Sequence, residues 1–463
     1  MDLNVCGGAY SIKAPISVQE SVNLYLEVES LGAQEQINLR RFPGLKLFSS
    51  PVNGSIRGMW TMAKVLYAVS GEALFSIDSS GTATNLGTIS GTSQVGMADD
   101  GSNLVIVNGV KGYVYNGSTL AEITDTDFVP ASKVYFLDTY FILQRTDTQQ
   151  FFISESGSAT SYLATDFATK EAQPGDIVAV HVANRDVYLR GAKTSETWRN
   201  TGNPDFPFER QEGTFQERGA LGLHSPIEMD NATFFLGDDR VVYSQAAYQA
   251  ERISHHAIET WLTAQSQSDI DAANGMTITH EGHYWYILTF PKGTWVYDAT
   301  TSKAMGSFEW FQLRSWEREN WRVKAVQTAY GKTYCGDDQG LIYELDPDTL
   351  NENGQRQIKR RVTPYYHNDR KPVSFHRLEL GFEQGVATAA VPNPQVFLEI
   401  SRDWGRTWSS RRARSLGQAG QYTQKAVWRR NGEARGHVFR WTITDDVEVT
   451  ITGGYGEAGV GSG

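Results

Sequence analysis

The chain alternates apolar and polar positions over long stretches, and the alternation repeats. In the first copy Val65, Tyr67 and Val69 alternate before a turn at Gly71, and a second apolar strand follows. Period-two patterning on both sides of a short turn predicts an antiparallel β-hairpin. Units of this kind occupy 64–78, 104–117, 134–144, 177–200, 233–245, 276–298 and 323–346.

The spacing of these units, roughly 35 to 50 residues, is typical of propeller blades. A small sheet on its own exposes both apolar faces, and radial stacking against its neighbours buries them. We therefore predict an all-β fold built on a β-propeller-like repeat of six or seven small antiparallel sheets. A long β-sandwich or meander without radial closure is the alternative.

A short helical insertion interrupts the repeat. Ile258, Trp261 and Leu262 share one face of a predicted helix, at the i, i+3 and i+4 positions. Ser268 is a candidate N-cap for a second short helix, and Gly275 is its candidate stop.

The composition changes after Pro347. The next stretch is polar and carries a basic run from Arg356 to Arg361, which we expect to be a solvated strand face. Five closely spaced strand patterns within 375–454 then predict a small C-terminal β-sandwich. The expected division is an N-terminal strand segment at 1–53 that closes the ring or contacts a neighbour, a propeller-like domain at 54–346, a linker at 347–372, a β-sandwich at 373–455 and a flexible tail at 456–463.

Composition narrows the function. The formal charge of −11 disfavours a protein that grips DNA by releasing counterions, although it allows one that only surrounds DNA. Cys6 and Cys335 are too few for a disulfide framework and match no zinc pattern. No apolar run has the length of a signal peptide or of a membrane span, so we expect neither.

The most distinctive local motif is Ser401-x-Asp403-x-Gly405-x-Thr407-Trp408, which resembles the Asp box of sialidases. Its expected role is structural: the aspartate accepts hydrogen bonds from the turn, the glycine takes a positive φ and the tryptophan packs beneath the hairpin. The motif occurs once, and no convergent pair of catalytic carboxylates is evident. We therefore predict a structural turn.

Other candidate motifs give no site. His280 and His283 flank a Gly turn between strands, which favours a hairpin over a metal site. Lys332 ends a segment that lacks the first glycine of a phosphate loop. We assign no catalytic, cofactor-binding or metal-binding residue. The predicted sandwich is locally cationic. We expect its arginines to lie on solvated outer strand faces, and contact with DNA phosphate or an acidic partner is the alternative. These arginines are Arg411, Arg412, Arg414, Arg429, Arg430, Arg435 and Arg440.

Three parts of the chain, taken in order, resemble one family: the tail nozzle, or packaged-DNA stabilisation, proteins of short-tailed bacteriophages. The resemblance covers most of the length and rests on the order and spacing of the matching segments. These are 17–27 with 39–45, 174–203 with 215–239, and 398–422 with 428–445.

The resemblance implies a non-enzymatic structural subunit of the virion tail, assembled in the host cytoplasm. It implies a homo-oligomer, a hexamer, that extends the DNA channel below the portal, retains the packaged genome and releases it at ejection. The implied partners are portal and adaptor ring proteins, a tail needle or plug protein, tailspikes or tail fibres, and DNA that passes without specific readout. No cofactor comes with this family.

Two other functions remain open from the residues. A sialidase-like or other glycan-hydrolysing propeller enzyme would explain the Asp-box-like motif. A non-catalytic propeller that binds glycans or proteins would share the same composition and fold class.

Overall fold

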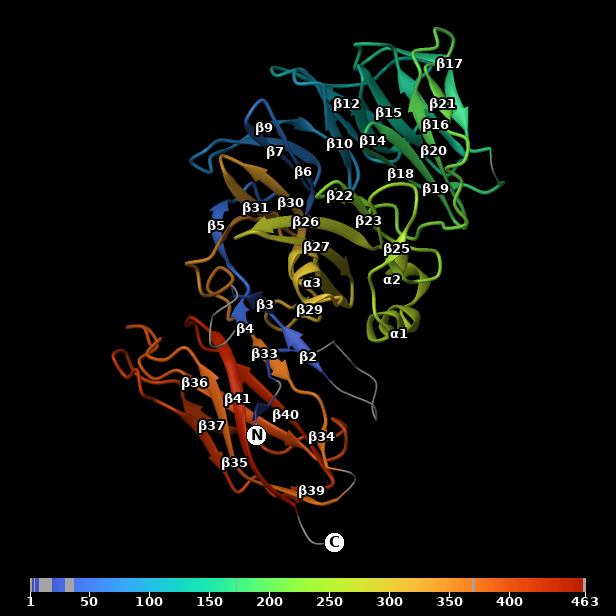
Figure 1. Cartoon of the computed structure of the whole chain (residues 1–463). Coiled ribbons are helices and arrows are strands. Elements are labelled where there is room, and N and C mark those ends of the chain that lie inside the picture. Colours follow the sequence, from blue (N-terminus) through green and yellow to red (C-terminus); the bar gives the residue numbers. More distant parts are fainter. Residues whose placement is uncertain are drawn as a thin grey trace.

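The computed structural model describes residues 2–3, 5–7, 19–29, 37–171, 173–368 and 371–460. It confirms the predicted fold class, an all-β chain with a propeller and a C-terminal β-sandwich. Figure 1 shows the propeller in the upper part of the view and the sandwich below it, with the N-terminus inside the sandwich.

Seven units of four antiparallel strands surround one axis in the described part of the chain. Six are separate sheets, and the seventh, blade 6, begins a longer sheet. Each of the seven predicted repeats lies in its own blade. The strands are β6 (Ile56–Met62), β7 (Val65–Ser70), β8 (Ala73–Ile77) and β9 (Ala83–Thr88) in blade 1; β10 (Gly96–Asp99), β11 (Leu104–Val107), β12 (Gly112–Tyr115) and β13 (Leu120–Glu122) in blade 2; β14 (Ala131–Leu137), β15 (Tyr140–Arg145), β16 (Gln150–Ser154) and β17 (Tyr162–Thr169) in blade 3; β18 (Ile177–Ala183), β19 (Asp186–Gly191), β20 (Ser195–Asn200) and β21 (Phe208–Arg210) in blade 4; β22 (Ile227–Met229), β23 (Ala232–Leu236), β24 (Val242–Gln245) and β25 (Glu251–Arg252) in blade 5; β26 (Asn274–His280), β27 (His283–Phe290), β28 (Gly293–Asp298) and β29 (Trp310–Leu313) in blade 6; and β30 (Val323–Ala329), β31 (Lys332–Asp337), β32 (Ile342–Asp346) and β5 (Gly44–Ser49) in blade 7.

The first hairpin of a blade usually turns in two residues. In every blade but blade 2, the innermost strand and the next strand are joined by two residues that both have positive φ. This geometry matches the twist of the paired strands and is the preferred hairpin turn. Glu281 and Gly282 form one of these turns, with φ of 47° and 88°, and Ala63 and Lys64 form another.

Blade 7 is closed by the N-terminal part of the chain. Strand β5 is its outermost strand and pairs antiparallel with β32. Leu45 on β5 is fully buried in a core that also contains Phe42, Trp285 and Trp321. Because the strand that closes the last blade comes from the other end of the repeat, the ring is held shut by non-local contacts.

The sandwich has strands from both ends of the chain. One sheet contains β3 (Leu24–Val28), β4 (Ile37–Arg41), β41 (Thr450–Val460), β35 (Val373–Phe382) and β38 (Ala426–Arg429), with β1 (Asp2–Leu3) and β39 (Glu433–Ala434) at its margin. The other contains β2 (Glu20–Val22), β33 (Lys359–Val362), β40 (Gly436–Ile443), β36 (Gln395–Ser401) and β37 (Arg412–Ser415), with β34 (Tyr366–His367) beside β40. Apolar side chains of the first 41 residues and of the C-terminal region share one core.

Strand β2 joins the two domains into a continuous sheet. It pairs in parallel with β29 of blade 6 and antiparallel with β33 of the sandwich. Beside it, Asn23 is fully buried with φ of 53°. Its side-chain amide donates to the carbonyls of Arg314 and Ile358 and accepts from the Arg314 backbone N–H, at 2.8 to 3.0 Å. Asn23 therefore links both domains by hydrogen bonds.

The helices differ in part from the prediction. Helix α1 (His256–Ala264) buries Ile258 and Leu262, as its pattern predicted. The N-cap of α2 (Gln267–Asp271) is Ser266, whose hydroxyl accepts from the Asp269 N–H, so the choice of Ser268 was wrong. Gly275 lies in β26 rather than ending a helix. Helix α3 (Ala299–Met305) was not predicted.

The segments expected as linker and tail both contain strands. The linker at 347–372 contains β33 and β34, and β41 continues through the expected tail to Val460, while residues 461–463 lie outside the described residues. The basic run in the linker is not a solvated face. Lys359 and Arg361 are 1 % and 4 % exposed. Arg361 donates to the carbonyls of Val5 and Gly7, so the N-terminus covers it.

Candidate functional site

The axis of the propeller encloses a cavity of about 440 Å³ lined by all seven innermost strands. Gln94 of blade 2 donates to the side chain of Asn274 in blade 6 at 2.9 Å, so a polar bridge crosses the channel. Asn274 in turn donates to the carbonyl of Lys324 in blade 7 at 2.7 Å. A space of this size suits a small molecule, and a duplex cannot pass through one subunit.

Two histidines and two lysines line this cavity, and the sequence analysis did not single them out. Lys133 comes from β14, His181 from β18, His224 from the segment before β22 and Lys324 from β30. Burial lowers the pKa of Lys133 to about 8. The only sequence signal is a polar residue at an inner-strand position, which is too common to identify a site.

The predicted Asp-box-like turn lies in the sandwich, after β36. Asp403 accepts hydrogen bonds from the Thr407 hydroxyl, the Thr407 N–H and the Ser401 hydroxyl, at 2.5, 2.8 and 2.7 Å. These bonds, led by that from the Thr407 hydroxyl, lower the pKa of Asp403 to about 2. Gly405 has φ of 85°. An aspartate held ionised by its own turn is poorly suited to acid–base catalysis.

Trp408, the last residue of the motif, contacts the sheet by a cation–π interaction with Arg440. The guanidinium of Arg440 lies 4.0 Å from the centre of the Trp408 ring. Arg440 also binds both carboxylate oxygens of Glu399, at 2.9 and 2.7 Å. The motif is thus connected to β36 and β40 and lies in a different domain from the axial cavity.

The arginines of the sandwich divide into bound and free groups. Arg412 donates to the side chain of Asn431, and Arg440 is paired with Glu399. Arg429, Arg430 and Arg435 are exposed and form no ion pair among the described residues. Arg411 and Arg414 are also exposed, although Arg411 lies 3.8 Å from Glu399 and Arg414 donates to the carbonyls of Val427 and Ala413. We call these five exposed arginines the sandwich basic face: Arg411, Arg414, Arg429, Arg430 and Arg435.

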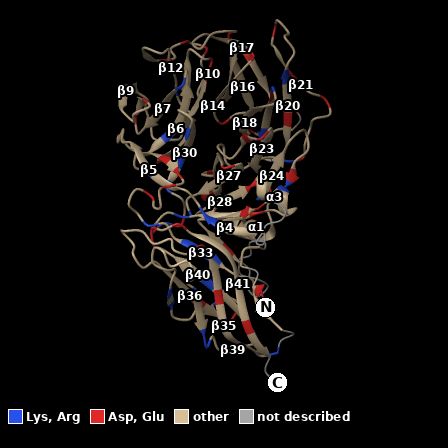
Figure 2. Ribbon diagram, turned by 60° about the vertical axis from the view of Figure 1, so that its left-hand side comes forward, with Lys and Arg blue, Asp and Glu red and all other residues tan. Residues whose placement is uncertain are grey.

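The sandwich differs in charge from the rest of the chain. Residues 371–460 carry twelve Lys and Arg against nine Asp and Glu, whereas the whole chain has 42 against 53. Figure 2 shows blue segments on β33, β40 and β36 of the sandwich, and both colours occur in both domains. This asymmetry gives the sandwich a surface that can attract an acidic partner.

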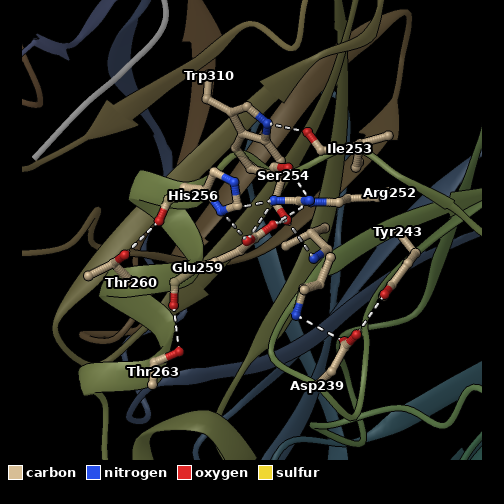
Figure 3. Close-up of polar contacts among 12 residues, drawn as sticks. Asp239, Tyr243, Arg252, Ile253, Ser254, His256, Glu259, Thr260, Thr263 and Trp310 are labelled. Atoms are coloured by element: carbon tan, nitrogen blue, oxygen red, sulfur yellow. Dashed lines mark hydrogen bonds and ion pairs between the residues drawn. The ribbon is translucent and has the colours of Figure 1, made fainter. Parts of the chain in front are cut away.

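A serine, a histidine and a glutamate lie close together at α1 (Figure 3). Arg252 binds both oxygens of Glu259 at 2.7 Å, and the Ser254 hydroxyl donates to Glu259 at 2.8 Å. His256 contacts Arg252 and Glu259, and no hydrogen bond joins it to Ser254. A nucleophile needs a base within reach, so this cluster holds α1 against β25 and does not form a catalytic relay.

His280 ends β26 and His283 begins β27, so the two histidines face each other across the two-residue turn of this hairpin. The His283 ring lies 2.6 Å from Asp298 and 3.2 Å from Glu27, and its side chain is buried. Among the described residues no group of three or more His, Cys, Asp or Glu side chains is arranged to hold a metal ion. None of the described helices is long and apolar enough to span a bilayer.

Two family models match nearly the whole chain. The model described as "Bacteriophage P22 Gp10, beta-propeller" matches residues 3–350, and that described as "Bacteriophage P22 Gp10, beta-sandwich" matches residues 359–458. The chain belongs to this family. The two matches divide the family fold near the point where β32 ends and β33 begins.

One curated relative and two solved structures are similar to this chain, and the structures carry no weight in the assignment because their TM-scores are below 0.5. The tail hub protein gp10 of Salmonella phage P22 is 22% identical over 460 residues, which cover 93% of this chain and 94% of that protein. BamB from Moraxella catarrhalis matches with a TM-score of 0.40 at 11% identity, over 73% of this chain and 97% of that one. The extracellular domain of the putative one component system BT4673 from B. thetaiotaomicron matches with a TM-score of 0.45 at 10% identity, over 82% and 49%.

Proposed function

We propose that this chain is a structural subunit of a short-tailed phage tail, acting as a hub or nozzle that retains the packaged genome and lets it out at ejection. The observation that carries the proposal is that both domains belong to the P22 Gp10 family. The relative from phage P22, which aligns over almost the full length, is a tail hub protein. The mature protein would then be part of the virion tail, after assembly in the host cytoplasm.

In this proposal the DNA path lies between copies of the chain. The axial cavity of one propeller is far too small for a duplex and is crossed by the Gln94–Asn274 bridge. A homo-oligomeric ring, which we take to have six copies, would leave a hole around its own axis. The net charge of −11 favours a wall to which phosphate does not adhere.

The proposed partners follow from a position below the portal. They are portal and adaptor ring proteins, a needle or plug protein, and tailspikes or fibres. The sandwich basic face is a candidate contact for an acidic surface on one of them, because its guanidinium groups are exposed and mostly unpaired. In the same proposal the Asp-box-like turn is a structural element, and the expected division holds for the propeller and the sandwich, with the N-terminal segment shared between the sandwich sheets and blade 7.

We also propose that the protein is not an enzyme. A structural role for the P22 relative supports this, and so does the local chemistry. Asp403 is held ionised by its own turn, and Ser254 is bound to Glu259 instead of a histidine. We expect no turnover of sialosides or capsular polysaccharides, and turnover that disappears in Asp403→Asn would favour the glycan-hydrolase alternative.

Electron microscopy of the full chain, alone and mixed with its portal and adaptor proteins, tests the structural role directly. We expect rings with a central hole, at least in the mixture. Glycan binding by an isolated monomer, with no ring in either sample, would contradict the proposal and favour a binding propeller.

A further inference from the structure

One of the seven contacts between neighbouring blades differs from the rest. Clusters of buried apolar side chains fill the other six. Between blades 4 and 5 the buried apolar cluster is small, containing Ala220, Phe235 and Tyr243, and polar side chains meet beside it. The ring of His181 lies 3.2 Å from the Thr233 hydroxyl, and Arg190 donates to the side chain of Gln245 at 2.6 Å. His181 and Arg190 are 1 % and 0 % exposed.

The positive charge at this contact is not balanced. The Arg190 guanidinium lies 3.6 Å from the centre of the Phe235 ring, and its Nε and Nη1 atoms are buried without a hydrogen-bond partner. Lys133, in the neighbouring cavity wall, forms no ion pair with any described carboxylate. Burial lowers the pKa of both groups. Lys133 is partly exposed to the cavity, whereas Arg190 is fully buried. A buried cation without a charge partner is unfavourable, so the contact is electrostatically incomplete.

Two histidines, His181 and His224, line the same cavity as Lys133. His181 stacks on Tyr188, with ring centres 4.8 Å apart, and its Nδ1 is buried without a partner. If the Thr233 hydroxyl donates to Nε2, then Nδ1 carries the proton and can donate. The pKa of His224 is lowered first by burial and then by the charge of Lys133. The pKa of His181 is lowered first by burial and then by the charges of Arg190 and Lys133. Both rings are therefore neutral near pH 7 and lie near Lys133.

We propose that the axial cavity of the propeller binds a small oxyanion, of the phosphate or carboxylate class, held by Lys133, His181 and His224. The anion would balance Lys133 and the Arg190 charge behind His181. A charged hydrogen bond to such an anion is stronger than a neutral one, which favours oxyanions over uncharged ligands. This inference does not depend on the proposed tail function, since it concerns one subunit.

Two features of the cavity bear on the choice of ligand. Glu228 is the one carboxylate that lines it among the described residues, and its charge does not shift the pKa of Lys133, His181 or His224. The lysine charge would repel a metal cation. Among the described residues, no group of three or more His, Cys, Asp or Glu side chains is placed to hold one. The site therefore favours an anion.

Isothermal titration calorimetry of the full chain, at an ionic strength fixed with NaCl, tests the proposal. One arm uses inorganic phosphate and the other malonate, and saturable binding of either ion supports it. Lys133→Met should weaken that binding roughly tenfold or more, whereas Lys133→Arg should retain most of it. The control is Lys46→Met, whose side chain is 61 % exposed on β5, and which should bind like the unmodified protein.

Thermal unfolding gives an independent readout. Without added anion, Lys133→Met should be about as stable as the unmodified protein, because Lys133 is partly exposed and forms no ion pair with a described carboxylate that the substitution would break. Added phosphate or malonate should raise the midpoint of the unmodified protein and not that of Lys133→Met. Absence of binding to both ions, or binding that survives Lys133→Met unchanged, would overturn the proposal.

Discussion

His283 lies where the propeller meets the sandwich, between two carboxylates. Asp298 ends β28 and caps α3, while Glu27 comes from β3 of the sandwich. Burial lowers the pKa of His283, but hydrogen bonds and charges from Asp298 and then Glu27 outweigh burial and raise it. His280 and Arg40 lie nearby, and Arg40 is 3.7 Å from Glu27. The protonated ring therefore binds the two domains to each other.

This raised pKa predicts a pH-dependent stability. Protonation of His283 stabilises the folded chain fully below the ordinary histidine pKa of about 6.5, and the contribution is lost as pH rises through the raised folded value. The loss of thermal midpoint in His283→Gln should thus be largest near pH 6 and smaller above the raised pKa. Melting curves between pH 5.5 and 8.5 measure it. His256→Gln, at a residue with a 91 % exposed side chain, is the control; a pH-independent loss in His283→Gln would contradict the assignment.

Asn23 is the second residue that joins the domains, and it does so by geometry and by hydrogen bonds. Asn23→Gly should tolerate the positive φ but lose the three side-chain hydrogen bonds. Asn23→Ala should lose the same hydrogen bonds and also strain the backbone at this φ. We expect Asn23→Gly to reduce the unfolding free energy by about 1–3 kcal/mol, because buried carbonyls lose their donor. Asn23→Ala should reduce it further, because Ala is strained at a positive φ. Urea unfolding monitored by tryptophan fluorescence would show it. Equal stability of all three proteins would mean that the junction does not depend on Asn23.

At the scale of elements, the ring depends on one short strand from the N-terminus. Strand β5 supplies the fourth strand of blade 7, and its two leucines differ in environment. Leu45 is fully buried, whereas Leu47 is 45 % exposed. The two leucines are the same residue type on the same strand and differ in burial, so substitution of Leu47 is a control for substitution of Leu45.

Truncation of these leucines should separate closure of the ring from simple loss of side-chain area. Leu45→Ala should reduce the unfolding free energy by about 2–5 kcal/mol because it opens a cavity between blades 6 and 7. Leu47→Ala should change it by less than about 1 kcal/mol. Differential scanning calorimetry of both variants would test this. Similar losses in the two variants would show that β5 is not a core strand.

At the scale of the whole molecule, the sandwich cannot be cut from the chain at a single point. Strands β1, β3 and β4 belong to one of its sheets and β2 to the other, although they precede the propeller in sequence. The core of the sandwich includes Leu3, Leu24 and Leu39. The propeller is thus inserted between two parts of one domain.

Fragments of the chain should reflect this arrangement. Residues 359–463 alone should fail to fold, because the core and two sheets lack their N-terminal strands. Residues 1–43 joined to 359–463 by a flexible linker should fold. Circular dichroism and thermal melting distinguish these outcomes, with the full chain as reference. A cooperative transition in the shorter fragment would contradict the proposed insertion.

The sequence by itself determined the type of the repeating elements and limited their number to six or seven, and the described part of the structure has seven. Period-two apolar patterning depends on local geometry, so each repeat predicted the hairpin of one blade, and the five C-terminal strand patterns predicted the sandwich. The motif from Ser401 to Trp408 likewise predicted a turn that its own side chains hold. Several tight turns escaped notice, because pairs such as Ala63–Lys64 have no Gly or Asn to mark a positive φ.

Only the tertiary structure decided which distant segments meet. That β5 closes blade 7, that β2 joins the two domains and that the N-terminus buries Arg361 depends on contacts between residues hundreds of positions apart. The same holds for Lys133, His181 and His224, which come from three blades and are ordinary polar residues in their own strands. The local sequence pattern cannot predict these long-range contacts, because they form only when the strands of distant segments assemble into the closed ring.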